Sequence, residues 1–404
     1  MTTTSPPVSS APAPAASRPG PIEWLYKNLF STWFNSLLTL VVVAVLGLFA
    51  KGMVTWATTQ AQWAVVPNNL ALFMTGLYPA DLSWRIWVIL GLIVTLSGLS
   101  WGILARHATT LFSRTVLVVV GITCGAIALF PVTRPSSPKL LGMVVLTVAM
   151  AWVGQQVSRR TQVLGQWLPV AWFLSYFVVL WLIGGGLGLE AVRTDKWGGL
   201  VLTLLMAVTG IALCFPIGVV LALGRRSDLP VVRWLAIAYI ELIRGVPLIA
   251  ILFMGQVMIP LFLPEGARPD RIIRAIIALT LFSSAYLAEN VRAGLQSVPR
   301  GQTEAAFSLG LNKPLTLAFI ILPQALKVAI PAIVGQFISL FQDTTLLATL
   351  GLLELLGISQ SILANPNYIG RYAEVYLFIG VIYWFFCYAM SLGSRRIERQ
   401  LNTG

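Results

Sequence analysis

Residues 297–326 read SVPRGQTEAAFSLGLNKPLTLAFIILPQAL and separate two long apolar runs. The middle of this stretch is too polar to cross a membrane as a helix. The residues from Glu304 onward favour a short helix, and Gly310 permits a turn that a side chain would obstruct. Pro314 suits the first turn of a second short helix. We therefore expect a small helix-turn-helix between two membrane spans.

The small residues of this loop suggest a docking surface. Glu304 is expected near the positive N-terminus of the first short helix. Ala305 and Ala306 are expected to face outward, where their narrow surface lets another backbone approach. Such a helix-turn-helix could enter a groove on a soluble partner. The loop residues alone leave open the alternative of an ordinary amphipathic linker.

The composition is that of an integral membrane protein. Hydrophobic residues make up 57% of the 404 positions and charged residues only 10%, and the mean hydropathy is +0.83. A soluble domain has about a quarter of its residues charged. The apolar residues come in runs that can cross a ~30 Å hydrocarbon core as helices, and 14 tryptophans suit the two membrane–water interfaces.

The apolar runs predict an all-α bundle of about ten spans. They lie at about 32–57, 84–104, 114–131, 139–157, 166–189, 198–223, 232–261, 271–291, 323–345 and 374–393.

Lysine and arginine in the loops predict the orientation. With the N-terminus in the cytoplasm, sixteen of the 27 Lys and Arg fall on the inner side, ten on the outer side and one, Arg244, within a span. The adjacent pairs Arg159–Arg160, Arg225–Arg226 and Arg395–Arg396 all fall inside. We therefore expect both termini in the cytoplasm.

The expected organisation has three parts. The first twenty residues are rich in Pro, Ala, Ser and Thr and have no apolar core, which is typical of a disordered extension and not of a signal peptide. We expect residues 1–31 to form a disordered cytoplasmic tail. Residues 32–189 are expected to form a five-span extension, and residues 190–404 a five-span working domain that contains the loop 297–323.

Ionisable residues within the spans lie almost only in spans six to ten. Charges at membrane depth are costly and usually face a partner or a watery cavity. Glu241 and Arg244 are three residues apart, as are Glu289 and Arg292, so each pair can neutralise itself on one helix face. Whether these pairs are structural or line a route for a polar solute stays open. Pro247 follows Arg244 closely and disturbs the helix, as in the broken helices that line cavities.

Two polar residues of the ninth span carry the same ambiguity. Gln336 lies within the span and Asp343 near its end. Asp343, followed by Thr344 and Thr345, is interpreted first as the cap of a helix start and second as a residue that faces the pathway.

Several site classes are not indicated. The three cysteines lie inside apolar runs, and their spacing predicts neither a metal site nor a disulfide. There is no G-x-x-x-x-G-K-[ST] loop, so no nucleotide site of that kind is expected. The net charge of +13 does not indicate nucleic-acid binding, because the cations stand singly or in pairs between apolar runs. We expect no catalytic residue.

The loop resembles the EAA motif of ABC importer permeases, with every spacing of that motif kept. The matching residues are Glu304, Ala305, Ala306, Gly310, Ile320, Leu322 and Pro323.

Other stretches extend this resemblance over residues 197–400. ELIRGVPLI, SSAYLAENVRAGLQSVPRGQTEAA and LLGISQSILANP are similar to the polar amino-acid uptake family of these permeases. The five-span first half more loosely resembles the longer of two paired permeases in general L-amino-acid and glutamate/glutamine/aspartate/asparagine importers. ENVRAG and QDTTL depart slightly from the family pattern, and Gln342 stands where a lysine is common.

The resemblance implies a permease core that imports amino acids. It implies two copies of a cytoplasmic ATPase that bind ATP and Mg²⁺, a second and related permease chain, and an extracytoplasmic amino-acid-binding protein. It implies that the EAA residues couple this chain to the ATPase, in a bacterial inner membrane, with no cofactor bound by this chain. We predict a substrate pathway lined by Arg244, Glu289, Arg292, Gln336 and Asp343.

Two other classes remain as alternatives. An ion-driven secondary transporter would use Asp343, Glu354 and Glu289 as relay carboxylates, and its uptake would persist without ATP. A membrane scaffold would show no solute flux.

Overall fold

The computed structural model describes residues 20–105, 111–129, 136–161 and 163–402. The described part is helical, and its only β pairings are two isolated bridges. The all-α prediction is confirmed. The chain divides into two compact units, residues 1–62 and 63–404, which are considered separately.

The first unit contains two helices within its described residues. Helix α1 spans Pro21–Leu29, with a proline in its first turn, Glu23 near its N-terminus and Lys27 near its C-terminus. These residues suit the ends of a helix and its dipole. Helix α2 spans Trp33–Thr55 and continues into a π-helical turn at Trp56–Gln60. The prediction that all of residues 1–31 are disordered is therefore wrong for Pro21–Leu29, and residues 1–19 lie outside the described part.

The second unit begins with helices from the first half of the sequence. They are α3 (Val65–Asn68), α4 (Leu70–Thr75), α5 (Ser83–Leu104), α6 (Arg114–Leu129), α7 (Ser137–Arg160) and α8 (Val163–Gly184). Glycines bring α5 and α7 into backbone contact, because a Cβ at Gly102 would stand 2.1 Å from the Ala151 carbonyl oxygen.

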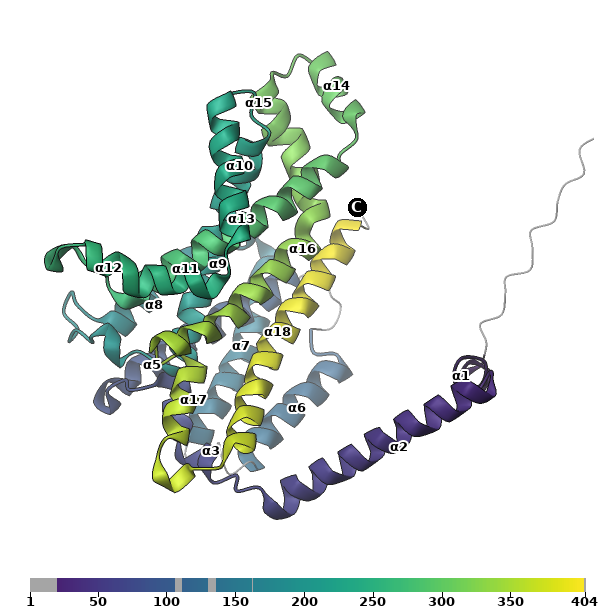
Figure 1. The fold of residues 1–404 in the computed structure, drawn as a ribbon, viewed down its shortest axis with the longest axis vertical. Coiled ribbons are helices and arrows are strands. Elements are labelled where there is room, and N and C mark those ends of the chain that lie inside the picture. Colours follow the sequence, from purple (N-terminus) through teal and green to yellow (C-terminus); the bar gives the residue numbers. More distant parts are fainter. Residues whose placement is uncertain (1–19, 106–110, 130–135, 162, 403–404) are drawn as a thin grey trace, which may run out of the picture. The chain divides into compact units, whose positions relative to one another are not determined.

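The remaining helices of the second unit come from the second half of the sequence (Figure 1). They are α9 (Gly199–Arg225), α10 (Pro230–Gly245), α11 (Leu248–Phe253), α12 (Ile259–Phe262), α13 (Arg271–Ser297), α14 (Arg300–Ser308), α15 (Lys313–Thr316), α16 (Leu322–Asp343), α17 (Leu355–Leu363) and α18 (Tyr372–Asn402).

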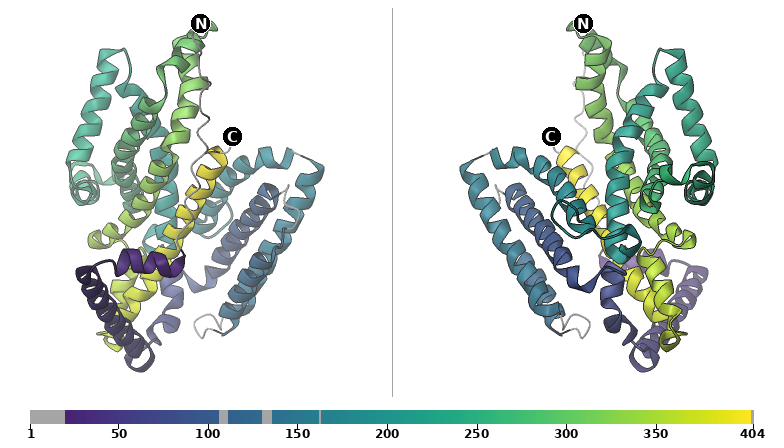
Figure 2. Two further views of the ribbon diagram at one scale, coloured as in Figure 1. Left: turned by 90° about the vertical axis from the view of Figure 1, so that its right-hand side faces the viewer. Right: turned by 90° about the vertical axis from the view of Figure 1, so that its left-hand side faces the viewer.

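Helices α9, α13 and α16 enclose the largest buried cluster, which includes Cys214, Leu287 and Leu340. Both views in Figure 2 show α13 and α16 alongside each other. They approach closely at Gly294, where an added Cβ would stand 2.3 Å from the Ala325 carbonyl oxygen. The two helices therefore touch through their backbones where they lead into and out of the 297–323 loop.

The seventh expected span is sharply bent. Helix α10 and the segment Leu248–Phe262 meet at 102° across a short break. Pro247 stands at the break and supplies the N-cap position of α11. A proline donates no backbone hydrogen bond and clashes with the preceding turn, which accounts for the break.

Fewer than ten of the described helices are long enough to cross a membrane. Eight described helices are long and apolar enough to cross a membrane, and the bent pair makes nine if it counts as one span. Helix α6, expected as the third span, has 16 described residues, or about 24 Å at 1.5 Å per residue, against a ~30 Å core.

The expected three-part organisation placed a boundary after residue 189, but the structure does not divide there. Residues 63–404 form one unit, because Val65 and Phe73 from the first half pack in one buried cluster with Leu355 and Val375 from the second half. The two halves are thus joined by a shared core.

Candidate coupling and transport sites

The loop 297–323 folds into the expected helix-turn-helix. Helix α14 ends in a Schellman motif, in which the Leu311 amide donates to the Ala306 carbonyl (3.1 Å) and the Gly310 amide to the Phe307 carbonyl (2.9 Å). Gly310 has φ of +81°, a left-handed conformation that glycine adopts without strain. The Asn312 side chain then caps α15 by accepting from the Leu315 amide at 3.1 Å. We call residues 300–316 the coupling segment.

The surface of the coupling segment differs from the prediction in one respect. Glu304 and Ala305 are exposed, but Ala306 is only 3% exposed and packs inward. Phe307 and Leu309 are exposed at 48% and 82%. The expectation that both alanines face outward is wrong for Ala306, because consecutive helix residues point in directions about 100° apart. Glu304 is the fifth residue of α14 and thus lies beyond its first turn.

The end of the EAA pattern joins the coupling segment to α16. Leu322 and Pro323 begin α16, with Leu322 half-buried and Pro323 exposed. The Gln324 side chain donates to the Gln302 side chain at 3.3 Å, which ties the start of α16 to α14.

A second tie reaches the loop between α9 and α10. Lys313 forms an ion pair with Asp228, and its hydrogen bond and positive charge lower the pKa of the Asp228 carboxyl. Arg226, in the same loop, donates to the Leu295 carbonyl near the end of α13 at 3.1 Å. The coupling segment is thus connected to α9, α10 and α13.

A cluster of charged side chains lies near the ends of these three helices; we call Arg225, Glu241, Arg244, Glu289 and Arg292 the charge cluster. Arg225 contacts Glu241 at 2.9 Å and Glu289 at 2.7 Å, and Arg292 contacts Glu289 at 2.7 Å. The Glu289–Arg292 pair is confirmed, whereas Glu241 pairs with Arg225 and not with Arg244. The three guanidinium groups exceed the two carboxylates by one positive charge.

Arg244 is the most weakly held cation of the charge cluster. Its guanidinium lies 3.8 Å from Glu289 and 5.3 Å from the ring centre of Tyr286. Its side chain is 35% exposed. Arg244 belongs to the last turn of α10, directly before the bend of this span.

Gln336 and Asp343 do not join the charge cluster in the contacts described. Both are half-buried on α16, seven residues apart, and thus on one face of that helix. The interpretation of Asp343 as a helix cap is wrong, because it precedes the 3₁₀ turn Thr344–Leu350 without a side-chain capping bond. Thr344 and Thr345 instead donate back to carbonyls of α16.

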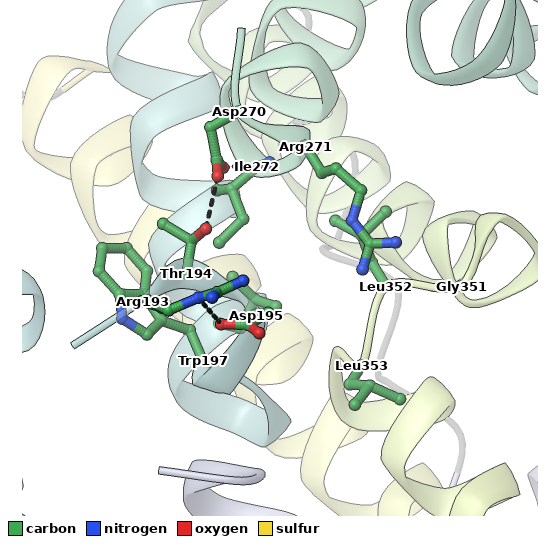
Figure 3. A pocket seen from close by; sticks show the side chains of 11 residues that line it. Arg193, Thr194, Asp195, Trp197, Asp270, Arg271, Ile272, Gly351, Leu352 and Leu353 are labelled. Carbon is green, nitrogen blue, oxygen red and sulfur yellow. Dashed lines mark hydrogen bonds and ion pairs between the residues drawn. The ribbon is translucent and has the colours of Figure 1, made fainter. Parts of the chain in front are cut away.

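A cavity of about 410 Å³ lies at the other end of α13 (Figure 3). We call it the α13 cavity. It is bounded by the 3₁₀ turn Thr194–Lys196, the first turn of α13 and the loop before α17. Its lining residues are Arg193, Thr194, Asp195, Trp197, Leu202, Asp270, Arg271, Ile272, Gly351, Leu352 and Leu353.

Comparison with known proteins identifies the family. Residues 214–403 match the family described as "Binding-protein-dependent transport system inner membrane component". The chain is 36% identical to the inner membrane amino-acid ABC transporter permease protein YhdY of Escherichia coli strain K12, over 98% of both chains. This chain belongs to the amino-acid ABC transporter permeases. This permease is also 35% identical to the glutamate/glutamine/aspartate/asparagine transport system permease protein BztC of Rhodobacter capsulatus, over 97% of this chain and 96% of that protein.

Among solved structures, the permease is similar to one titled "Crystal structure of an amino acid ABC transporter with histidines". The identity is 31% and the TM-score 0.46, over 50% of this chain and 92% of that one. The family and the apolar helices make this permease an integral inner-membrane protein.

Two buried charges of the permease were not assigned correctly from the sequence. Arg85, counted with the outer loop cations, is 2% exposed and donates to the Glu190 carbonyl at 2.8 Å. Glu354, considered as a relay carboxylate, is fully buried and caps α17 through the Leu356 and Gly357 amides at 2.9 and 2.8 Å. A carboxylate directly before an apolar helical run is a capping signal that could have been recognised.

Proposed function

We propose that this permease carries amino acids inward through the membrane, driven by a separate ATPase that binds the coupling segment. The observation that carries this proposal is the coupling segment itself. Its first helix, α14, and the residue that follows it present Glu304, Ala305, Phe307 and Leu309 to solvent. Exposed apolar side chains beside a charged one are typical of a protein–protein contact.

The ties of the coupling segment give a route for a mechanical signal. The Lys313–Asp228 pair connects it to the loop that starts α10, and the end of α13 holds Glu289 and Arg292. Movement of the coupling segment would therefore act on the helices that carry the charge cluster. Packed helices shift as rigid elements, which transmits a displacement with little loss.

The charge cluster, with Gln336 and Asp343, is proposed to line the substrate pathway. Its excess positive charge and the weakly held Arg244 suit the carboxylate that every amino acid has. BztC is named for glutamate, glutamine, aspartate and asparagine, so these four amino acids are the first candidates for this permease.

The partners are proposed from the family. We infer two cytoplasmic ATPase copies that bind ATP and Mg²⁺, a second permease chain of related but different sequence, and an extracytoplasmic amino-acid-binding protein. This chain has no G-x-x-x-x-G-K-[ST] loop, which supports the assignment of nucleotide binding and hydrolysis to the partner. The loop charges support cytoplasmic termini.

Gly310→Val tests the coupling role. A β-branched residue at φ +81° is strained by about 1–2 kcal/mol or more, although a Cβ there would meet no neighbour. The matched control is Gly301→Val, because Gly301 is also exposed and unobstructed but has no positive φ. Amino-acid uptake and ATP hydrolysis are measured in proteoliposomes that contain the complete complex.

The proposal expects Gly310→Val to lower the amount of amino acid imported per ATP, while membrane insertion stays normal and Gly301→Val behaves like the wild type. Equal coupling in both variants would contradict it. Uptake that continues without ATP and collapses with the proton or sodium gradient would instead favour a secondary transporter.

Arg244→Gln tests the pathway. Loss of a charge-assisted contact to a carboxylate is worth roughly 1.5–3 kcal/mol, so the KM for uptake should rise about 10- to 100-fold. Arg233→Gln is the control, since it removes the same charge from the exposed opposite end of α10. If Arg244→Gln assembles normally and its KM is unchanged, the charge cluster is structural and does not line the substrate pathway.

A further inference from the structure

We propose that the α13 cavity is a second binding site for the transported amino acid, at the opposite end of α13 from the coupling segment. This inference rests on the proposed function. Helix α13 has 27 residues, so the cavity and the coupling segment are separated by about 40 Å along it. If the coupling segment faces the cytoplasm, the cavity is where an amino acid arrives from outside.

The cavity walls offer hydrogen-bond donors that suit a carboxylate. Arg193 and Arg271 line the cavity from different elements, with Arg193 beside Asp195 and Arg271 beside Leu352 (Figure 3). The Arg193 side chain is 85% exposed. The Arg271 guanidinium has no hydrogen bond or ion pair within the described part of the chain. Arg193 uses its Nε on Asp195 at 3.3 Å, which leaves its terminal nitrogens available. Guanidinium groups on two walls of one cavity can donate to a carboxylate.

The same cavity offers an acceptor for an ammonium group. Asp195 accepts from Arg193 through one oxygen only, and its side chain is 44% exposed. Asp270 is different, because it already accepts from Thr194 at 2.5 Å and from the Ile272 amide at 2.8 Å. Asp270 therefore connects the Thr194 turn to the first turn of α13, while one oxygen of Asp195 remains available to a ligand.

Apolar lining residues complete the match to an amino acid. Leu202, Ile272 and Leu352 are at most 6% exposed and line the cavity together with the charged groups. A hollow of about 410 Å³ lined by both polar and apolar groups is of the size that small-molecule sites have. An acidic side chain of the binding protein would need the arginines but would have no use for the Asp195 acceptor, so we favour the free amino acid.

A cysteine-protection experiment tests this site in the complete complex. Cys124, Cys214 and Cys387 are replaced by alanine, and uptake by this background is verified. Leu353→Cys then places one thiol in the cavity wall, and Lys196→Cys places a control thiol on the exposed turn outside the lining. The complex in nanodiscs, without nucleotide or binding protein, is alkylated with a neutral maleimide.

The probes are L-glutamine, L-glutamate, L-asparagine and L-aspartate, with 4-aminobutanamide as the analogue of glutamine that lacks the α-carboxylate. A transported amino acid is expected to slow alkylation of Leu353→Cys several-fold and to leave Lys196→Cys unchanged. The analogue is expected to protect weakly. Adding Arg271→Gln should raise the half-protecting concentration about tenfold or more, and Arg271→Lys should raise it less.

The outcomes separate this inference from the proposed function. If the complex imports an amino acid that gives no protection, or protection that Arg271→Gln leaves unchanged, the second site is refuted and the proposed function stands. If the binding protein alone protects both thiols and free amino acid protects neither, the region is a protein-docking surface and the second site is again refuted. If the wild-type complex imports none of the four amino acids, the proposed function fails for them.

Discussion

Replacing Gly294 by alanine should separate the two helices that frame the coupling segment. The new Cβ would stand 2.3 Å from the Ala325 carbonyl oxygen and 3.0 Å from the Ala329 Cβ. An ordinary contact needs at least 3.4 Å, so α16 would have to move by roughly 1 Å. Overpacking of this kind costs about 1–3 kcal/mol.

The assay compares Gly294→Ala with Gly335→Ala in the purified complex. Gly335 lies on α16 and has open space around it, so alanine there should be neutral or stabilising by about 0.5–1 kcal/mol. Thermal melting followed by loss of monodisperse complex gives stability, and uptake per ATP hydrolysed gives coupling. Gly294→Ala should lower both.

The reasoning is refuted if Gly294→Ala melts and couples like Gly335→Ala. That result would mean that α13 and α16 do not touch through their backbones. A lower melting temperature with unchanged uptake per ATP would support the backbone contact between α13 and α16. It would also mean that this contact does not contribute to coupling.

Three further predictions concern charged residues. Glu289→Gln should destabilise the complex by about 1–3 kcal/mol because it leaves Arg244 and Arg292 without a carboxylate partner, and adding Arg292→Gln should recover part of the loss in a double-mutant cycle; a purely additive double mutant would contradict the pairing. Glu354→Ala should lower the melting temperature by removing a buried helix cap worth about 0.5–2 kcal/mol, whereas an unchanged melting temperature would argue against the cap. The lowered pKa of Asp228 means that its stabilising pair with Lys313 is present above the normal carboxyl pKa of about 4 and is lost as the pH falls through the folded value; wild type and Asp228→Asn should therefore melt differently at neutral pH and converge in acid, and a constant difference would contradict the pair.

Local chemistry explains what could be predicted from the sequence. The helix-turn-helix of the coupling segment was predictable because Gly310 and Pro314 act on the backbone next to them. Helix spans were predictable because apolar length is a local property. The Glu289–Arg292 pair followed from a spacing within a single helix.

Features that depend on distant segments could not be predicted. Glu241 takes Arg225 as its partner across two helices, and Ala306 turns inward because of its packing within the second unit. Arg85 is buried against a carbonyl 105 residues away. The α13 cavity combines three segments that are far apart in sequence. None of these segments has a sequence motif that indicates a binding site.

The most direct measurement of the central claim is a cross-link from the coupling segment to the ATPase. Ala305→Cys, on the exposed side of α14, carries a photoreactive maleimide in the assembled complex, and Lys196→Cys serves as the exposed control at the other end of the core. The account predicts a covalent adduct with the ATPase from position 305 and none from position 196. An intact complex that gives no ATPase adduct from position 305, or equal adducts from both, would contradict it.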